Sequence, residues 1–229
     1  MAYELGFAYL LANEPLRARG YLEEAAATGG PFADLARLEL VRLIATGAGA
    51  AGVDTDADAA NTVDDAAVIA EIRGVLLAFE DRTRIDEAWY AGVQSLETAG
   101  RYAAAIELAL ELPLRYPNGP RADDALYAAA RLRKAEGQKL AALEPLYRIV
   151  ESYASGELRE PAYLLIAHIY SEPGPLFSPA RACAALRAVR FPMSVERGQP
   201  NPTFPSGQNS WSDVAAESAL AFERDFCQY

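Results

Sequence analysis

Four aspartates in one stretch of the chain have the spacing of a calcium-binding loop. Asp54, Asp56, Asp58 and Asp65 stand at positions 1, 3, 5 and 12 of a continuous window. Carboxylates that alternate in this way wrap oxygen ligands around Ca²⁺. Position 6 is Ala59, where the sharp turn requires Gly, and position 12 is Asp where a longer Glu is usual. Two interpretations stay open, a calcium site and a solvated acidic insertion before the next helix.

The two cysteines, Cys183 and Cys227, are candidates for a disulfide. If the C-terminal segment folds back, the bond would staple it to the preceding helices, and it would persist in an oxidising compartment. The alternative is two unpaired buried thiols. The absence of a CxxC motif excludes a zinc site built on cysteine pairs.

The single histidine, His168, excludes every site that needs two histidines. No nucleophile elbow, zinc-protease motif or glycine-rich phosphate loop accompanies it. We therefore expect a protein that is not an enzyme. We also expect no cofactor, apart from the calcium considered above.

Composition and charge limit the class of partner. The chain has 229 residues, of which 52% are hydrophobic and 23% charged, so it can bury a sizeable core. The net charge of -11 argues against nucleic acid and anionic lipid as partners, because both require a basic face. No apolar run approaches the ~20 residues that span a bilayer. We expect a protein or peptide partner with basic segments, no nucleic acid and no direct membrane insertion.

An internal repeat organises the middle of the chain. The segment 86–91, with sequence DEAWYA, recurs 37 positions later as DDALYA at 123–128. At the same offset Gly100 corresponds to Gly137, and a further copy begins at Ala162-Tyr163. Such self-similarity indicates stacked structural repeats.

Each copy has the apolar spacing of two helices separated by a glycine. Ala105 and Ala142 are predicted to face the first helix of their own pair, where a larger side chain would push the axes apart. Because neither helix buries its apolar face alone, stacked pairs give an all-α fold, an α-α superhelix. We expect five pairs, over residues 1–30, 32–46 with 63–80, 84–116, 121–154 and 158–190.

The predicted organisation has two parts. Residues 1–190 form the helical solenoid, with an acidic insertion at 47–62. Residues 191–229 comprise an irregular segment rich in Pro, Gly and Ser and a final helix from about Ser212 to Phe226 that caps the last pair.

These residues resemble the tetratricopeptide repeat family. The family pattern has large or aromatic residues on both helices, a glycine between the helices, an alanine on the second helix and a proline that ends the repeat. The copy that matches it best has Trp89, Val93, Leu96, Gly100, Tyr102, Ala105 and Pro117 at these positions. The period of 37 differs from the family standard of ~34. The phrase RYPNGPRADDALY, residues 115–127, is similar to the bacterial envelope branch, which includes the outer-membrane-assembly lipoprotein and the Tol–Pal-associated periplasmic protein.

The resemblance implies a concave groove that is lined by the first helices and holds a peptide or partner helix. The lining positions would be Tyr3, Phe7, Tyr90, Gln94, Tyr127, Arg131, Lys134, Leu164 and His168. Aromatic side chains with Arg are typical of interface hot spots. For Tyr90 and Tyr127 the competing interpretation is ordinary core, and for Arg131 and Lys134 a solvated helix face.

Two functions are therefore expected from the sequence. The first is a non-catalytic scaffold that binds a partner in the groove. The second is a structural subunit of a larger envelope assembly that uses its convex and end surfaces, because the chain starts inside a repeat without a polar cap. The resemblance and the cysteines place the protein in the periplasm or cell envelope. Since no leader is present, that location would require a processed or truncated chain, and the alternative is the cytoplasm.

Overall fold

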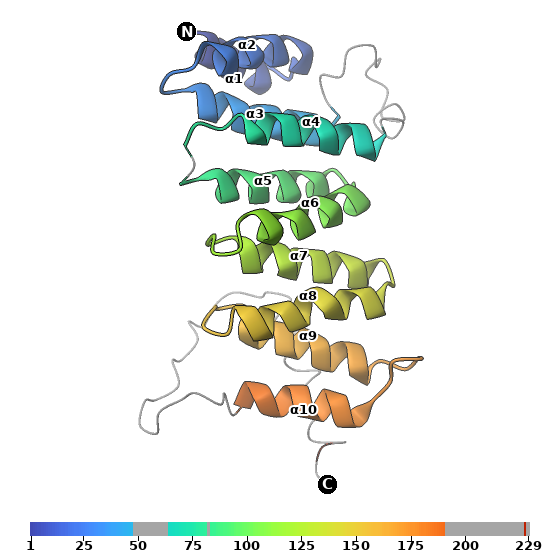
Figure 1. Cartoon of the computed structure of the whole chain (residues 1–229). Helices are drawn as coiled ribbons and strands as arrows, with labels where there is room; N and C mark the ends of the chain where they lie inside the picture. Colours follow the sequence, from blue (N-terminus) through green and yellow to red (C-terminus); the bar gives the residue numbers. More distant parts are fainter. Residues whose placement is uncertain (48–63, 82, 191–226, 228–229) are drawn as a thin grey trace. The chain divides into compact units, whose positions relative to one another are not determined.

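The computed structural model describes residues 1–47, 64–81, 83–190 and 227, and all regular elements within these ranges are α-helices (Figure 1). Consecutive helices pack against one another, as in an α-α solenoid, which confirms the predicted all-α fold class. None of the described helices has the length and apolar character needed to cross a membrane. The chain divides into two compact units, residues 1–129 and 130–229.

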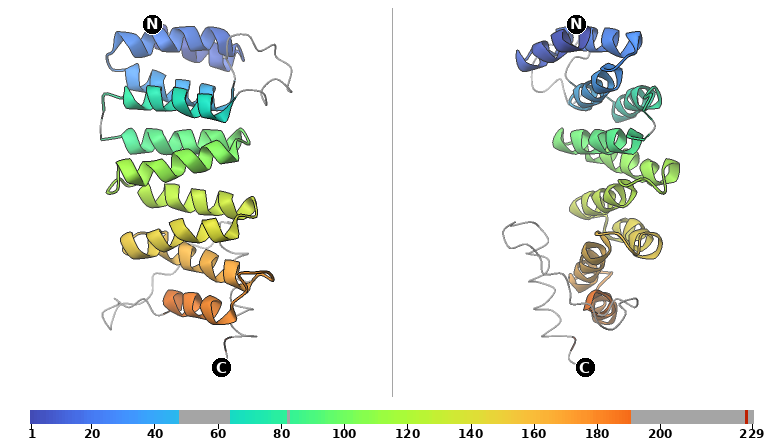
Figure 2. Two further views of the ribbon diagram at one scale, coloured as in Figure 1. Left: turned by 45° about the vertical axis from the view of Figure 1, so that its right-hand side comes forward. Right: turned by 90° about the vertical axis from the view of Figure 1, so that its left-hand side faces the viewer.

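The first unit contains six complete helices and the start of a seventh. In chain order these are α1 (Ala2–Leu11), α2 (Pro15–Thr28), α3 (Ala33–Ala45), α4 (Asp65–Leu77), α5 (Ile85–Thr98), α6 (Tyr102–Arg115) and α7 (Ala122–Ala135). The helices of each pair run antiparallel (Figure 1 and Figure 2). Helix α2 packs on α3, and α3 contacts both α4 and α5, so successive pairs stack.

The second unit begins within α7 and continues with α8 (Lys139–Ser152), α9 (Arg159–Ser171) and α10 (Pro179–Arg190). Helix α9 contacts both α8 and α10. The ends of all these helices agree with the predicted pairs to within a few residues. The predicted acidic insertion beyond Gly47 and the helix at 212–226 lie outside the described residues.

Small residues let the two helices of a pair approach closely. Ala105 and Ala142, predicted to face their partner helices, are both fully buried. In the first pair a Cβ added to Gly6 would lie only 2.8 Å from Leu22 Cγ, so the leucine side chain occupies the space that a larger residue would need. This contact joins α1 to α2 and leaves no room for a side chain at position 6.

Trp89 is the largest fully buried side chain in the described part of the chain. Its Nε1 donates a hydrogen bond to the carbonyl oxygen of Leu108 at 3.0 Å, which satisfies its one polar atom inside the core. The ring of Tyr116 meets the indole edge-on at a centroid distance of 5.9 Å. Trp89 therefore links α5 to α6 and to the turn that ends α6.

A buried arginine joins the first two helix pairs. Arg37 on α3 donates to the carbonyl oxygen of Ala26 at 2.8 Å and to the carboxylates of Asp34 and Glu80 at 2.7 and 3.2 Å. Burial would raise the pKa of Asp34, but the backbone N–H groups of Asp81 and Glu80 and the Arg37 guanidinium outweigh it and lower that pKa. The ion pairs compensate the cost of burying the Arg37 charge.

The turns inside the pairs require a left-handed backbone. Gly100 between α5 and α6 has φ of 75°, and Gly137 between α7 and α8 has φ of 79°. In the first pair the same place is taken by Asn13 at φ of 57°. Asparagine is one of the few residues with a side chain that tolerates this region. These turns let each pair reverse direction within a few residues.

Replacing Gly100 with Ala should destabilise the protein by about 1 kcal/mol, because only backbone strain opposes the new methyl group. Gly100→Asn should cost less. The matched control is Gly20→Ala inside α2, where nothing lies within 4 Å of the added Cβ, and it should stabilise by about 0.5 kcal/mol. Urea unfolding followed by far-UV circular dichroism measures both changes. Equal effects of the two Gly→Ala changes would contradict this account of the turns.

Candidate binding face on the first helices

All the predicted partner-binding residues lie on the first helix of a pair, and none is fully buried. Four helices carry them, α1, α5, α7 and α9. In the first unit they are Tyr3, Phe7, Tyr90, Gln94 and Tyr127, and in the second they are Arg131, Lys134, Leu164 and His168. Tyr90 and Tyr127 are partly buried, so each has a surface exposed to solvent as well as contacts within the stack.

Helix α1 brings Tyr3 and Phe7 together. Their ring centroids are 6.2 Å apart, and the ring of Tyr3 also stacks on that of Phe32 at a centroid distance of 5.5 Å. Burial raises the pKa of the Tyr3 phenol, and the carboxylate of Glu39 raises it further. The Tyr3 ring therefore contacts two other aromatic rings, and the oppositely charged Glu39 and Arg42 lie nearby.

Helix α5 presents Tyr90 beside an arginine. The guanidinium carbon of Arg121 lies 5.8 Å from the centroid of the Tyr90 ring. Arg121 directly precedes α7, and its backbone N–H donates to the buried carboxylate of Asp86 at 3.3 Å. Asp86 thus holds the start of α7 in place. Gln94, one helical turn after Tyr90, is exposed.

In the second unit His168 and Lys134 meet at one carboxylate. Glu172 accepts from Lys134 Nζ at 3.0 Å and from His168 Nε2 at 2.7 Å, and it also pairs with Lys139. These are the only lysines and the only histidine in the chain. Glu172 directly follows α9, one turn after His168, while the lysines flank the turn between α7 and α8.

The electrostatics of this cluster favour a neutral imidazole beside a charged carboxylate. Burial lowers the pKa of His168, the charge of Lys134 lowers it further, and Glu172 opposes both. For Glu172, burial would raise the pKa, but hydrogen bonds from Lys139 and Lys134 outweigh it and lower that pKa. Arg131 is exposed on α7 and Leu164 partly buried on α9, and neither belongs to the cluster.

Sequence reasoning missed three residues that shape these surfaces. Phe32 and Arg121 each precede a helix and reach an aromatic ring of the preceding pair, a contact with no pattern in the sequence. Glu172 stands four residues after His168, and that helical spacing was the one available signal.

Of the predicted calcium ligands only Asp65 lies within the described residues, at the start of α4. Its Oδ1 accepts from Arg101 Nη1 at 2.6 Å, so the carboxylate already has a cationic partner. Asp54, Asp56 and Asp58 lie outside the described residues. Within the described ranges no group of three or more acidic, His or Cys residues is placed to hold a metal ion.

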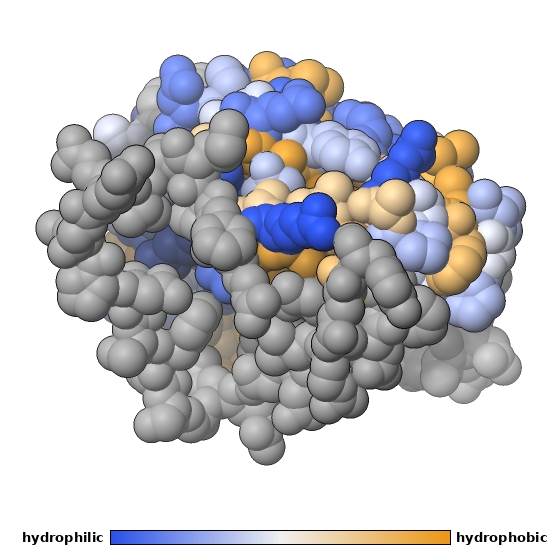
Figure 3. Space-filling view, turned by 90° about the horizontal axis from the view of Figure 1, so that it is seen from below, coloured by the Kyte–Doolittle hydropathy of each residue, from blue (hydrophilic) through white to orange (hydrophobic). Residues whose placement is uncertain are grey.

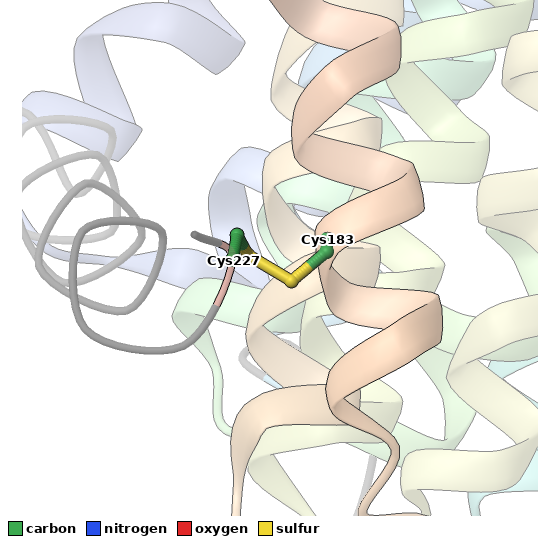
Figure 4. Close-up of a disulfide and its surroundings, with 2 residues drawn as sticks. All are labelled: Cys183 and Cys227. Atoms are coloured by element: carbon green, nitrogen blue, oxygen red, sulfur yellow. A yellow bond between two sulfur atoms is a disulfide. The ribbon is translucent and has the colours of Figure 1, made fainter. Parts of the chain in front are cut away.

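The two cysteines are joined by a disulfide. Figure 4 shows Cys227 directed toward Cys183 on α10, with a Cα–Cα distance of 5.7 Å. This is the first of the two alternatives that the sequence left open. The bond ties a residue near the end of the sequence to the last described helix.

We expect the pKa of His168 to lie below its ordinary value of about 6.5. The unfolded chain then binds more protons than the folded chain near that pH. The contribution of His168 to the free energy of unfolding should therefore be fully present above pH ~6.5, and it should be lost as the pH falls through the pKa of the folded state. One histidine gives one imidazole Cε1–H resonance, so an NMR titration of the tag-free protein reads this pKa directly.

Two variants test whether the neighbouring charges shift the pKa of His168. Lys134→Gln should raise the pKa of His168 and Glu172→Gln should lower it, because each removes one charge of opposite sign. A His168 pKa at or above its ordinary value in the parent protein, or shifts of the same sign in both variants, would show that the cluster does not control the imidazole.

Alkylation without reductant should leave the mass of the oxidised protein unchanged, and alkylation after reduction should add two groups. Cys183→Ala should expose a single reactive thiol at Cys227. Since the bond links residues 44 positions apart, the double Cys→Ala variant should lose about 4 kcal/mol in the chain-entropy estimate. Two alkyl groups on the unreduced protein would contradict the pairing.

Comparison with known proteins adds no family to this description. No protein-family model matches the chain, and no curated protein matches it. The tetratricopeptide resemblance therefore depends on the repeated residues and on the helix pairs described above.

Proposed function

We propose that this chain is a non-catalytic, tetratricopeptide-like scaffold that binds a partner protein or peptide along the first helices of its pairs. The observation that carries the proposal is the recurrence of partly exposed tyrosines on first helices, at Tyr3, Tyr90 and Tyr127. Tyrosine supplies a large, rigid contact area with a polar tip, and it is enriched at interface hot spots.

Rigid helix pairs favour binding because the ordering cost is paid during folding. The buried contacts of Trp89 and the close packing at Gly6 hold the first helices before any partner arrives. A surface that is already ordered loses little side-chain and backbone entropy on association. Most of the contact energy is then available as affinity.

The charge supports a basic partner. The net charge of -11 attracts cationic segments and should accelerate association at low ionic strength. Figure 3 shows hydrophilic residues beside hydrophobic ones on the described surface seen in that view. Specific interfaces combine an apolar centre with a polar rim.

A second candidate is a structural subunit of a larger envelope assembly. Three leucines of the first pair have large exposed fractions, Leu5 at 45%, Leu11 at 76% and Leu16 at 57%. If these leucines form one continuous patch, a neighbouring subunit would cover it. The Cys183–Cys227 disulfide supports an oxidising compartment such as the periplasm for either function.

Co-purification from the native host at low ionic strength tests the scaffold proposal. Tyr90→Ala should reduce the recovered partner by roughly tenfold, the effect of one interface hot spot. Tyr102→Ala is the matched control, because this tyrosine is 44% exposed on the second helix α6. Thermal unfolding of both variants shows whether they remain folded.

Recovery of no partner at low ionic strength, or equal loss in both tyrosine variants, would contradict binding along the first helices.

Light scattering tests the second candidate. A subunit that uses the leucine-rich surface should self-associate or copurify in a stable complex that Leu11→Glu disrupts. A monomer whose partner is unaffected by Leu11→Glu would rule out that candidate.

A further inference from the structure

The first helix pair carries an aromatic stack with two exposed ends. The ring of Tyr3 stacks on those of both Phe7 and Phe32, with interplanar angles of 25° and 6°. Phe7 is 42% exposed on α1, and Phe32, directly before α3, is 47% exposed. We call these three residues the aromatic stack. Two exposed phenyl rings beside a partly buried tyrosine form an aromatic surface on this helix pair.

An equivalent place in the third pair holds a cation. Tyr90 on α5 has the position of Tyr3 on α1, and the residue before the next first helix, Arg121, lies over its ring. In the first pair the residue before the next first helix is Phe32. The chain therefore puts a guanidinium on the ring in one repeat and a phenyl group on it in another.

Arginine on an aromatic face is a recurrent contact in this protein. Within the described residues, guanidinium groups lie 5.3 to 5.8 Å from the rings of Tyr9, Trp89, Tyr90, Tyr163 and Tyr170. No described cation lies over a ring of the aromatic stack. The stack is thus an aromatic surface without the partner that these other rings have.

The charged groups around the stack are of both signs, and one carboxylate among them is largely exposed. Glu4, on the same helix, has a side chain that is 72% exposed, and its one ion pair is with the terminal amine. Glu39 and Arg42 both lie close enough to act on the pKa of the Tyr3 phenol, in opposite directions, and they pair with each other at 2.8 Å. A cation above a phenyl ring would meet the negative face of the ring within the field of an acidic protein.

We propose that the aromatic stack is an anchoring subsite for an arginine side chain in a basic segment of the partner. This inference rests on the scaffold function proposed above and names the chemistry of one contact. Arginine fits better than lysine because its planar guanidinium stacks on a ring and is more weakly hydrated than an ammonium group. An apolar side chain could also cover the rings, but its binding would not depend on charge.

Fluorescence anisotropy with the full chain and three synthetic peptides tests the inference. The labelled peptides have equal length and alternate serine with arginine, with lysine or with citrulline. Citrulline keeps the planar shape of the arginine side chain but carries no charge. We expect the arginine peptide to bind most tightly, the lysine peptide less tightly and the citrulline peptide at least tenfold more weakly than the arginine peptide.

Leucine variants separate the contribution of the aromatic rings to affinity from the contribution of apolar surface area. The double variant Phe7→Leu with Phe32→Leu keeps a large apolar side chain at each site. Its affinity for the arginine peptide should be about fivefold lower, as expected for loss of a cation–π contact. Tyr102→Leu, at an exposed ring on α6 in the same unit, should change affinity less than twofold. If the double variant unfolds, Phe7→Leu alone should still weaken binding.

Three results would overturn the inference: no binding of the arginine peptide, equal binding of the citrulline peptide, or unchanged affinity in the leucine variants. These failures are distinguishable from failure of the scaffold function. Partner recovery that is sensitive to Tyr90→Ala but not to the Phe7 and Phe32 changes would preserve the scaffold and remove only the arginine subsite.

Discussion

The short distance between the two helices of a pair is the constraint on which the rest of the structure depends. At Gly6 the side chain of Leu22 fills the place that a Cβ would take, and Ala105 and Ala142 are fully buried at their own positions. Larger residues there would separate the axes and open voids, which close-packed interiors do not tolerate. Close pairing lets the aliphatic residues of both helices share one core, and it fixes which positions of each first helix remain for other contacts.

Positions outside that core have a consistent chemistry. Aromatic rings on the helix surfaces are accompanied by arginines, as Arg121 accompanies Tyr90 and Arg159 accompanies Tyr163. Such contacts bury the arginine stem and keep the charge near water. They also hold residues that precede or begin one helix against a ring. No described cation lies over the aromatic stack at Tyr3, which we propose as a surface for an external arginine.

Electrostatics has a second role in the chain. Several of its positive groups are used for internal pairing, as Arg37 is with Asp34 and Glu80, and as both lysines are with Glu172. The excess carboxylates give a net charge of -11. Long-range attraction is therefore directed at cationic partners, while short-range specificity must come from aromatic and apolar contacts, because exposed ion pairs contribute little affinity.

The sequence by itself determined the helix pairs and which positions of successive pairs correspond to one another. Both follow from local periodicity: the 37-residue repeat places Ala105 and Ala142, or Tyr90 and Tyr127, at equivalent positions. Only the tertiary structure decided which side chains meet. The stacking of Phe32 on Tyr3, the convergence of Lys134 and His168 on Glu172, and the union of Cys183 with Cys227 join residues far apart in the chain. Such contacts depend on how the chain packs in three dimensions, and no sequence period encodes that packing.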